Sequence, residues 1–197
     1  MIEEIRQAYP KAYVAINDAT IDSEFSMASD VLTCSLLKTL AGSKPGGDFL
    51  ELGTGTGLST SWILDGMDAS SSLISIDNDE RFLTIARDFL GRDQRLKLEC
   101  TDGGDWLEKN STKQFDYIFA DTWHGKYLML EEAIRMLKPG AFYIIDDMLP
   151  QDNWPEGHAE KATKLLEALE KREDLLITKQ CWATGLVIAT KRNRSSG

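Results

Sequence analysis

Apolar positions follow two different spacings along the chain. Residues 1–45 contain no strand-like run, and residues 29–41 place their apolar side chains at helical spacing. From Phe49 onward, short apolar blocks of strand length alternate with amphipathic segments, several of which end at Gly or Pro. The pattern predicts strands at 49–52, 73–76, 96–100, 117–120, 142–145, 175–177 and 186–189, and helices at 29–41, 59–64, 80–90, around Trp106, 127–137 and 156–171.

Strands that alternate with helices predict an α/β protein with a doubly wound fold, in which a mostly parallel sheet carries helices on both faces. The last two predicted strands have no convincing helix between them, so we expect them to form an antiparallel edge of a seven-stranded sheet. No repeat, linker or low-complexity tract interrupts the chain. We therefore expect a single domain, with its body at 46–192 and residues 1–45 as a helical segment packed on it.

Composition and charge narrow the class of protein. The chain has 197 residues, of which 42% are hydrophobic, as is typical of a globular domain. Lys and Arg total 22 against 32 Asp and Glu, which gives a formal net charge of −10. This sign disfavours nucleic acid and anionic membranes as partners, because both need a basic face. No apolar run approaches the roughly 20 residues of a membrane helix.

The cysteines indicate a reducing compartment, and the N-terminal residues do not resemble a secretion signal. Cys34, Cys100 and Cys181 are odd in number and far apart, which favours buried thiols over disulfides. With two histidines and no paired cysteines, zinc sites built from Cys and His are nearly excluded. The first ten residues, MIEEIRQAYP, are acidic and mixed, unlike a signal peptide. We therefore expect a cytoplasmic protein.

Acidic residues stand at or just beyond the ends of four consecutive predicted strands, and the strand before them runs into a glycine-rich turn at 53–57. Ligands of open parallel sheets bind beyond the carboxyl ends of the strands, so these residues are expected to share one site. The acidic residues are Asp77, Asp102, Asp121, Asp146 and Asp147.

The glycine turn and Asp77 each have a physical role in binding an adenosine-containing cofactor. Glycines let the backbone turn tightly and approach a ligand, and the following helix points free N–H groups at the same place. Asp77 lies 20 residues beyond Gly57, which suits a carboxylate that binds two ribose hydroxyls. Nicotinamide sites use G-x-G-x-x-G, whereas this run is G-x-G-x-G with Leu58 in the sixth position. The spacing therefore argues against a nicotinamide cofactor.

The run ELGTGTG at 51–57, followed by Asp77, resembles the S-adenosylmethionine site of Rossmann-like methyltransferases. The resemblance implies a Rossmann-like fold in which Ser59 binds the methionine carboxylate and Asp102 accepts from the adenine amine. It also implies that residues 27–29 lie over the methionine moiety. The residues expected to contact the cofactor are Glu51, Gly53, Thr54, Gly55, Gly57, Ser59, Asp77, Asn78, Asp102, Gly103 and Asp121.

Two later stretches are similar to the catechol O-methyltransferase and caffeoyl-CoA O-methyltransferase group: FDYIFADTWHGKY at 115–127, and LKPGA at 137–141 leading to the acidic pair. The match covers about residues 24–190. It implies methyl transfer from S-adenosylmethionine to a hydroxyl of a small catechol-like or phenolic acceptor. It further implies that Asp121, Asp146 and Asp147 bind one divalent metal, normally Mg²⁺. Such an ion takes oxygen ligands, holds the acceptor oxygen and lowers the pKa of its hydroxyl.

Two positions depart from the pattern of this group. Its third metal ligand is usually Asn, where this chain has Asp147. In the catechol enzymes a lysine three residues after the first aspartate serves as base, and here that position is His124. Histidine titrates near neutrality and can do the same task, so His124 and Asp121 are the expected catalytic residues. Lys126 is expected to be a solvated lysine at a helix start.

Three aromatic or imidazole side chains near these motifs carry a weaker signal. His158 is expected to be structural or exposed. For Trp154 core packing is favoured over a place at the substrate mouth, and for Trp123 packing and a wall of the methyl-transfer region are equally favoured.

Three other interpretations stay open. One is a metal-independent methyltransferase, and another is a module that binds the cofactor without turnover. A nicotinamide oxidoreductase is disfavoured by the turn spacing and by the lack of an obvious Tyr-x-x-x-Lys. RNA or DNA methylation is disfavoured by the net charge and by the absence of an Asn/Asp-Pro-Pro-Tyr segment after the fourth strand. The expected partner is a small hydroxylated molecule, and a homodimer is compatible because many relatives are homodimers.

Overall fold

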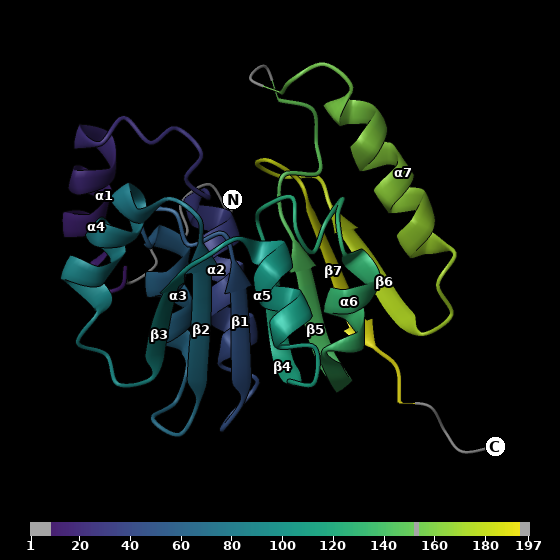
Figure 1. Cartoon of the computed structure of the whole chain (residues 1–197), viewed down its shortest axis with the longest axis horizontal. Coiled ribbons are helices and arrows are strands. Elements are labelled where there is room, and N and C mark those ends of the chain that lie inside the picture. The colour runs from purple at the N-terminus through teal and green to yellow at the C-terminus, as the bar shows by residue number, and fades with distance from the viewer. Residues whose placement is uncertain (1–8, 152–153, 194–197) are drawn as a thin grey trace, which may run out of the picture.

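Seven strands form one sheet, in the order β3-β2-β1-β4-β5-β7-β6, in the computed structural model of the chain (Figure 1). The structure describes residues 9–151 and 154–193; residues 1–8, most of the stretch considered above as a targeting signal, lie outside the described residues. The strands are β1 (Asp48–Leu52), β2 (Ser72–Asp77), β3 (Leu96–Cys100), β4 (Phe115–Ala120), β5 (Leu137–Ile145), β6 (Leu175–Gln180) and β7 (Leu186–Lys191).

Strand direction confirms the predicted mostly parallel sheet. β1 pairs in parallel with β2 and β4, and β2–β3 and β4–β5 are parallel as well. β7 is antiparallel to both of its neighbours, β5 and β6. The antiparallel strand therefore lies one place inside the edge, and β6 forms the edge itself.

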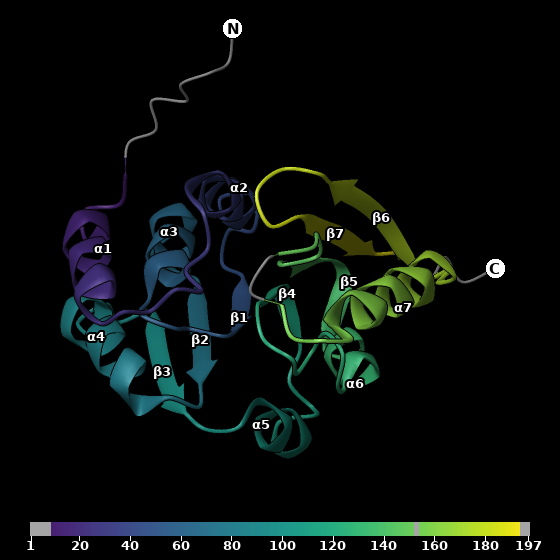
Figure 2. The ribbon, with the colours of Figure 1, turned by 90° about the horizontal axis from the view of Figure 1, so that it is seen from above.

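Helices cover both faces of the sheet (Figure 2). One face packs against the first four helices, in a core that includes Ile16, Leu37 and Ile63. The other face packs against the last three, in a core that includes Trp106, Ile134 and Leu165. The helices are α1 (Tyr13–Asp22), α2 (Val31–Ala41), α3 (Leu58–Gly66), α4 (Glu80–Leu90), α5 (Gly103–Lys109), α6 (Leu130–Arg135) and α7 (His158–Glu170).

The N-terminal helices share the core of the sheet. Ile16 of α1 and Leu37 of α2 are fully buried in the same cluster as Phe49 of β1. Burying such side chains removes apolar surface from water at about 25 cal/mol per Å². Within the described part of the chain, no helix is long and apolar enough to cross a membrane.

The prediction of a helix over 127–137, ended by Lys-Pro-Gly, is wrong at both of its ends. Only α6 is helical there, and β5 already begins at Leu137 and runs through Pro139. Leu137 pairs with Phe115, and the register shifts before Tyr117, which is the kind of irregular ladder that tolerates a proline. The tertiary pairing with β4 thus overrides the local helical pattern.

The neighbours β1 and β4 mark the point where the strand order changes direction. From β1 the chain moves outward through β2 to β3, and then returns to β4 on the other side of β1. In a doubly wound sheet such a switch point opens a crevice at the carboxyl ends of the strands. The segments that follow β1, β2, β4 and β5 all meet there.

Candidate functional site

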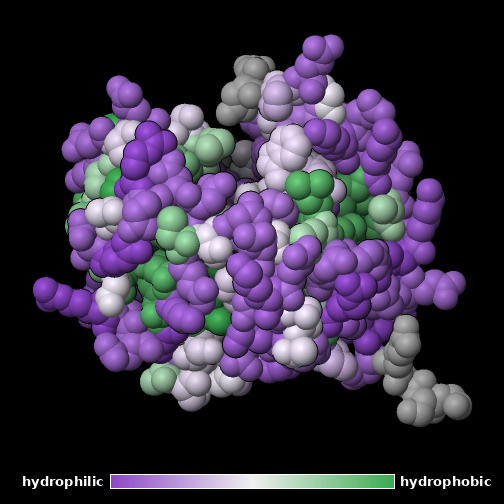
Figure 3. Space-filling view, viewed as in Figure 1, coloured by the Kyte–Doolittle hydropathy of each residue, from purple (hydrophilic) through white to green (hydrophobic). Residues whose placement is uncertain are grey.

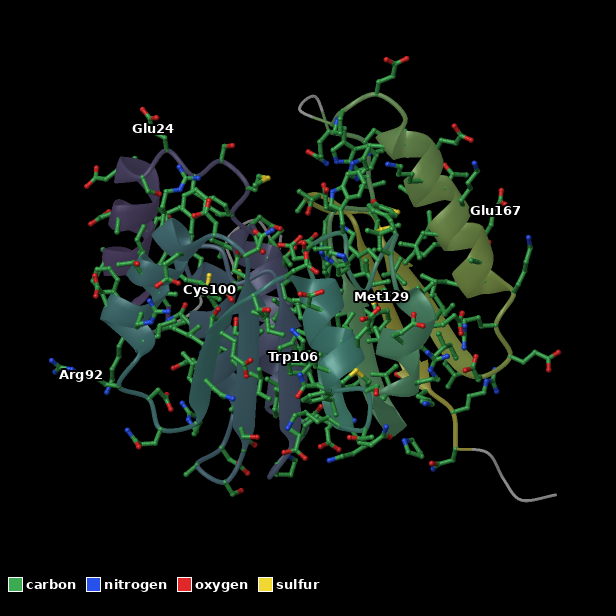
Figure 4. All side chains as sticks on the ribbon, viewed as in Figure 1. Glu24, Arg92, Cys100, Trp106, Met129 and Glu167 are labelled. Atoms are coloured by element: carbon green, nitrogen blue, oxygen red, sulfur yellow. The ribbon has the colours of Figure 1, made fainter. Side chains whose placement is uncertain are left out.

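A cavity of about 500 Å³ lies at the carboxyl ends of the strands. It is bounded by the segments after β1, β2, β4 and β5, by residues 25–29, and by residues 154, 155 and 158 before and at the start of α7. Figure 3 shows the surface hollowed at its upper edge, between the lobe of α1 and α4 and the lobe of α7. Glu24, labelled at the upper edge in Figure 4, directly precedes the segment 25–29. That segment lines the cavity, and its residues 27–29 are the ones expected from the sequence to lie over the methionine moiety.

The glycine turn after β1 is held against the ends of β2 and β4. Gly53 has a φ of +106°, and a Cβ atom there would lie 2.8 Å from the carbonyl oxygen of Asp121. The N–H of Gly55 donates to Asp77 Oδ2 at 2.8 Å, and the N–H of Asp79 donates to Oδ1 at 2.9 Å. These two bonds fix the Asp77 carboxylate beside the turn, so it faces the cavity in one orientation.

Glu51 lies beneath the turn and is not among the residues that line the cavity. Its side chain is fully buried, and its carboxylate accepts hydrogen bonds from the hydroxyls of Ser59, Thr60 and Ser75 at 2.5–2.7 Å. Burial raises the pKa of Glu51 to about 7, against the lowering effect of these hydroxyls. Glu51 thus ties α3 and β2 to β1. Ser59 lines the cavity, but its hydroxyl already donates to the Glu51 carboxylate.

A small cavity of about 40 Å³ extends the site between β2, β3 and β4. Its lining includes Asn78, Gly103 and His124, and it shares Gly53, Asp77, Asn78 and Thr122 with the large cavity. Asp102 caps α5 through hydrogen bonds from two backbone N–H groups, and its Oδ2 lies 3.8 Å from Nδ1 of His124. The structure therefore places His124 beside Asp102, and not among the residues that line the large cavity.

Asp121 and Asp146 are brought together at the ends of β4 and β5. Burial raises the pKa of Asp121 well above its ordinary value, and the charge of Asp146 raises it further. Burial also raises the pKa of Asp146, whose Oδ1 accepts from the Thr184 hydroxyl at 2.5 Å and from the N–H of Asp147 at 2.7 Å. Ser29 donates to Asp121 Oδ2 at 3.1 Å. Two buried carboxylates so close to each other need a positive charge or a proton between them.

Asp147 is directed to a different set of partners. Its backbone has a φ of +61°, and the indole N–H of Trp154 donates to both of its carboxylate oxygens at 3.0–3.1 Å. The Trp154 ring stacks on His158 with the ring centres 4.3 Å apart. Nε2 of His158 lies 2.9 Å from the hydroxyl of Tyr127 and 3.9 Å from Asp147 Oδ2. This aromatic wall of Tyr127, Trp154 and His158 lines the large cavity, together with Trp123.

The three aspartates do not fit a divalent ion well. Both carboxylate oxygens of Asp147 accept from the indole N–H of Trp154, and Oδ1 of Asp146 accepts two hydrogen bonds. The charge of Lys126, whose ammonium lies 5.3 Å from the centre of the Tyr127 ring, lowers the pKa of both Asp121 and Asp146. Within residues 9–151 and 154–193 no group of three or more His, Cys, Asp or Glu side chains is arranged to hold a metal ion. The three-aspartate metal site therefore remains a prediction that this donor arrangement does not favour.

Two further residues line the cavity, and the structure corrects the expectation for the first of them. Lys126, expected to be solvated, is only 4% exposed and lines the cavity. His158, expected to be structural or exposed, is 6% exposed, and its Nδ1 is buried with no hydrogen-bond partner in the described structure. His158 sits in a polar local sequence, whereas Lys126 directly precedes the apolar run 127–130, and neither pattern by itself signals the burial of the charged or imidazole side chain. Gly125 before Lys126 was the available hint, since a glycine at that point permits a sharp turn.

The strand order, the switch point and the glycine turn with its acidic partner define the class: a Rossmann-like α/β protein with a cofactor-type site. Comparison with known families agrees. The family model described as "Methyltransferase domain" matches residues 50–148, from β1 to the acidic pair after β5. The chain belongs to this methyltransferase family.

Curated relatives match part of the chain. A protein named "Putative O-methyltransferase" from Mycobacterium avium (strain 104) is 28% identical over 118 residues, which are 56% of this chain and 51% of that protein. "Putative O-methyltransferase ML1075" from Mycobacterium leprae (strain TN) is 32% identical over 91 residues, 44% of this chain and 39% of that protein. The matches thus span about half of the first relative's length and less of the second.

Solved structures share the fold over nearly the whole chain. An O-methyltransferase from Bacillus cereus in complex with SAH has a TM-score of 0.83 at 17% identity, covering 95% of this chain and 94% of that one. The O-methyltransferase TomG from Streptomyces achromogenes, in complex with SAM, has a TM-score of 0.81 at 20% identity, covering 96% and 93%. At these identities the likeness establishes the Rossmann-like methyltransferase fold.

Proposed function

We propose that the chain is an S-adenosylmethionine-dependent O-methyltransferase that acts on a hydroxyl of a small catechol-like or phenolic acceptor. The observation that carries the proposal is the Asp77 carboxylate, fixed by the N–H groups of Gly55 and Asp79 at the mouth of the glycine turn. A carboxylate held there is suited to receive the two hydroxyls of a ribose. Membership of the methyltransferase family and the names of the relatives support the same conclusion.

We assign the two ends of the cofactor to the two cavities. The adenine would lie against the residues that line the small cavity, Asn78, Gly103 and His124, so His124 would contact the base of the cofactor at that end. The turn 53–57 and the segment 25–29 would enclose the methionine part. S-adenosylmethionine supplies a methyl group bound to a positively charged sulfur. What the chain must add is a bound acceptor oxygen in line with that methyl group.

The acceptor end of the large cavity lies between the aromatic wall and the carboxylate pair. Tyr127, Trp154 and Trp123 offer flat apolar surface for an aromatic ring. Burial raises the pKa of Asp121, so its carboxylate, where it is ionised, is a stronger base than an ordinary aspartate. In this proposal Asp121 takes the hydroxyl proton as the new O–CH₃ bond forms and the S–CH₃ bond breaks. The role of His124 as base, predicted from the sequence, gains no support from its place beside Asp102.

Calorimetric titration with S-adenosylhomocysteine tests the cofactor part of the proposal. We expect one site per chain, with affinity reduced in Asp77→Ala. Asp65→Ala is the matched control, because Asp65 pairs with Lys38 at the end of α3 and does not line either cavity. If the wild-type protein binds no S-adenosylhomocysteine, the proposed function is wrong. If Asp77→Ala binds as tightly as the control, Asp77 is not the ribose ligand.

A further inference from the structure

His158, the first residue of α7, lines the large cavity and is enclosed by three aromatic side chains. Its ring stacks on Trp154, with the ring centres 4.3 Å apart. It meets the rings of Trp123 and Tyr127 edge-on, with the centres 5.9 Å and 5.1 Å apart. The residue is 6% exposed. Packing on one face and along the edges holds the imidazole in one orientation, so the surroundings of its two nitrogens are fixed.

The two nitrogens of His158 have different neighbours. Nδ1 is buried and has no hydrogen-bond partner within residues 9–151 and 154–193. Nε2 lies 2.9 Å from the Tyr127 hydroxyl and 3.9 Å from Oδ2 of Asp147. A single proton on Nδ1 would bury an N–H group without an acceptor, which is rare in folded proteins. A proton on Nε2 is donated to the Tyr127 oxygen and lies near the Asp147 carboxylate, so this form of the ring is favoured.

The hydroxyl of Tyr127 is then left with a hydrogen to donate. Its oxygen accepts from His158, and no other hydrogen bond of this hydroxyl occurs among the residues that the structure describes. The N–H of Tyr127 donates to the carbonyl oxygen of Trp123 at 3.0 Å, which fixes the residue on the turn after β4. Tyr127 lines the large cavity, as Asp121 does. It therefore brings an unused O–H donor to the wall of the cavity that we assign to the acceptor.

The reacting hydroxyl of the acceptor would make poor use of this donor. Its oxygen must give an electron pair to the methyl carbon, and a hydrogen bond donated to that oxygen holds the electrons back. A second oxygen beside it takes no part in the bond changes and can accept freely.

We propose that the Tyr127 hydroxyl, oriented by His158, donates a hydrogen bond to the oxygen next to the reacting hydroxyl of a catechol-like acceptor. Tyr127 contacts the acceptor, and His158 is a positioning residue that acts through Tyr127. The inference rests on the proposed function and decides between its two acceptor classes, because a plain phenol has no second oxygen to accept this bond.

Binding of catechol and of phenol to the complex with S-adenosylhomocysteine, followed by NMR titration, tests the inference. The two probes differ by one hydroxyl, and a chelator keeps metal ions out of both titrations. The wild-type protein is expected to bind catechol about 2–10-fold more tightly than phenol, the range of one net hydrogen bond. Tyr127→Phe removes the donor and keeps the ring. It should lose the preference for catechol, while its affinity for phenol stays within about twofold of the wild type.

A double-mutant cycle tests the part of His158. His158→Phe keeps an aromatic ring on Trp154 and removes Nε2, so the preference for catechol should fall. In the Tyr127→Phe background the same replacement should leave the preference unchanged, because His158 acts through the Tyr127 hydroxyl. A purely structural role of either residue would instead change the affinity for both probes alike. Tyr13→Phe is the matched control, since it makes the same change in α1 at a residue that lines neither cavity.

The inference is overturned if the wild type binds catechol no more tightly than phenol, which includes binding neither probe. It is equally overturned if Tyr127→Phe keeps the preference that Tyr13→Phe shows. Should His158→Phe fail to fold, His158→Leu takes its place in the cycle. Failure of the wild type to bind S-adenosylhomocysteine would instead refute the proposed function, so the two failures are distinguishable.

Discussion

Replacing Glu51 with Gln tests whether this carboxylate is a buried anchor beneath the glycine turn. The side chain is fully buried and accepts three hydroxyl hydrogen bonds, from Ser59, Thr60 and Ser75. Its pKa is about 7 in the folded protein against an ordinary value of 4.5. Between those two values the folded state keeps a proton that the unfolded chain has released. Stability from Glu51 is therefore fully present below pH 4.5 and is lost as the pH rises through about 7.

The size of the effect follows from the two pKa values. Their difference corresponds to about 3 kcal/mol of unfolding free energy once the pH exceeds the folded-state value. Gln keeps the shape of the side chain and has no charge to bury, while the three hydroxyls can still turn toward it. The gain of Glu51→Gln over the wild type should therefore grow by about 2–3 kcal/mol between about pH 5 and about pH 8.

Urea unfolding of both proteins at the two pH values measures this difference, because other titrating groups are common to both and cancel. Glu167→Gln makes the same chemical change on the exposed face of α7 and should show no such growth (Figure 4). A Glu51→Gln difference that does not change with pH would refute the reasoning, because the carboxylate would then titrate alike in the folded and unfolded chains.

Four further outcomes are expected. Asp77→Ala should weaken S-adenosylhomocysteine binding in calorimetry by about 1–3 kcal/mol, the value of a charged hydrogen-bonding group. Asp121→Ala should abolish methyl transfer while leaving that affinity nearly intact, and an equal loss of affinity would contradict the separation of acceptor and cofactor ends. Trp154→Phe keeps the stacking on His158 but removes the donor to Asp147, so urea unfolding should show a loss of about 1 kcal/mol. Phe119→Ala, at a fully buried position of β4, should cost about 3–5 kcal/mol in the same assay, and a loss below 1 kcal/mol would mean that the core collapses around the gap.

Local patterns in the chain determined most of the fold and the end of the site that we propose for the cofactor. The predicted helix 80–90 and strand 96–100 coincide with α4 and β3, because amphipathic spacing and bounding glycines are local signals. The parallel order placed the glycine turn and Asp77 on one rim, and the hydrogen bond from Gly55 to Asp77 joins them directly. These features depend on residues close in sequence or on the rule that parallel strands end at one edge.

Only the tertiary structure decided the arrangement of the end that we propose for the acceptor. Ser29 hydrogen-bonds Asp121, which is 92 positions away in the sequence, and Tyr127 hydrogen-bonds His158, which is 31 positions away. The indole N–H of Trp154 donates to Asp147. The inward turn of Lys126 depends on Gly125 packing against Leu52 of β1. A sequence lists which charges exist, but their effect depends on the distances between them and on how much water remains, and both are set by packing between distant segments.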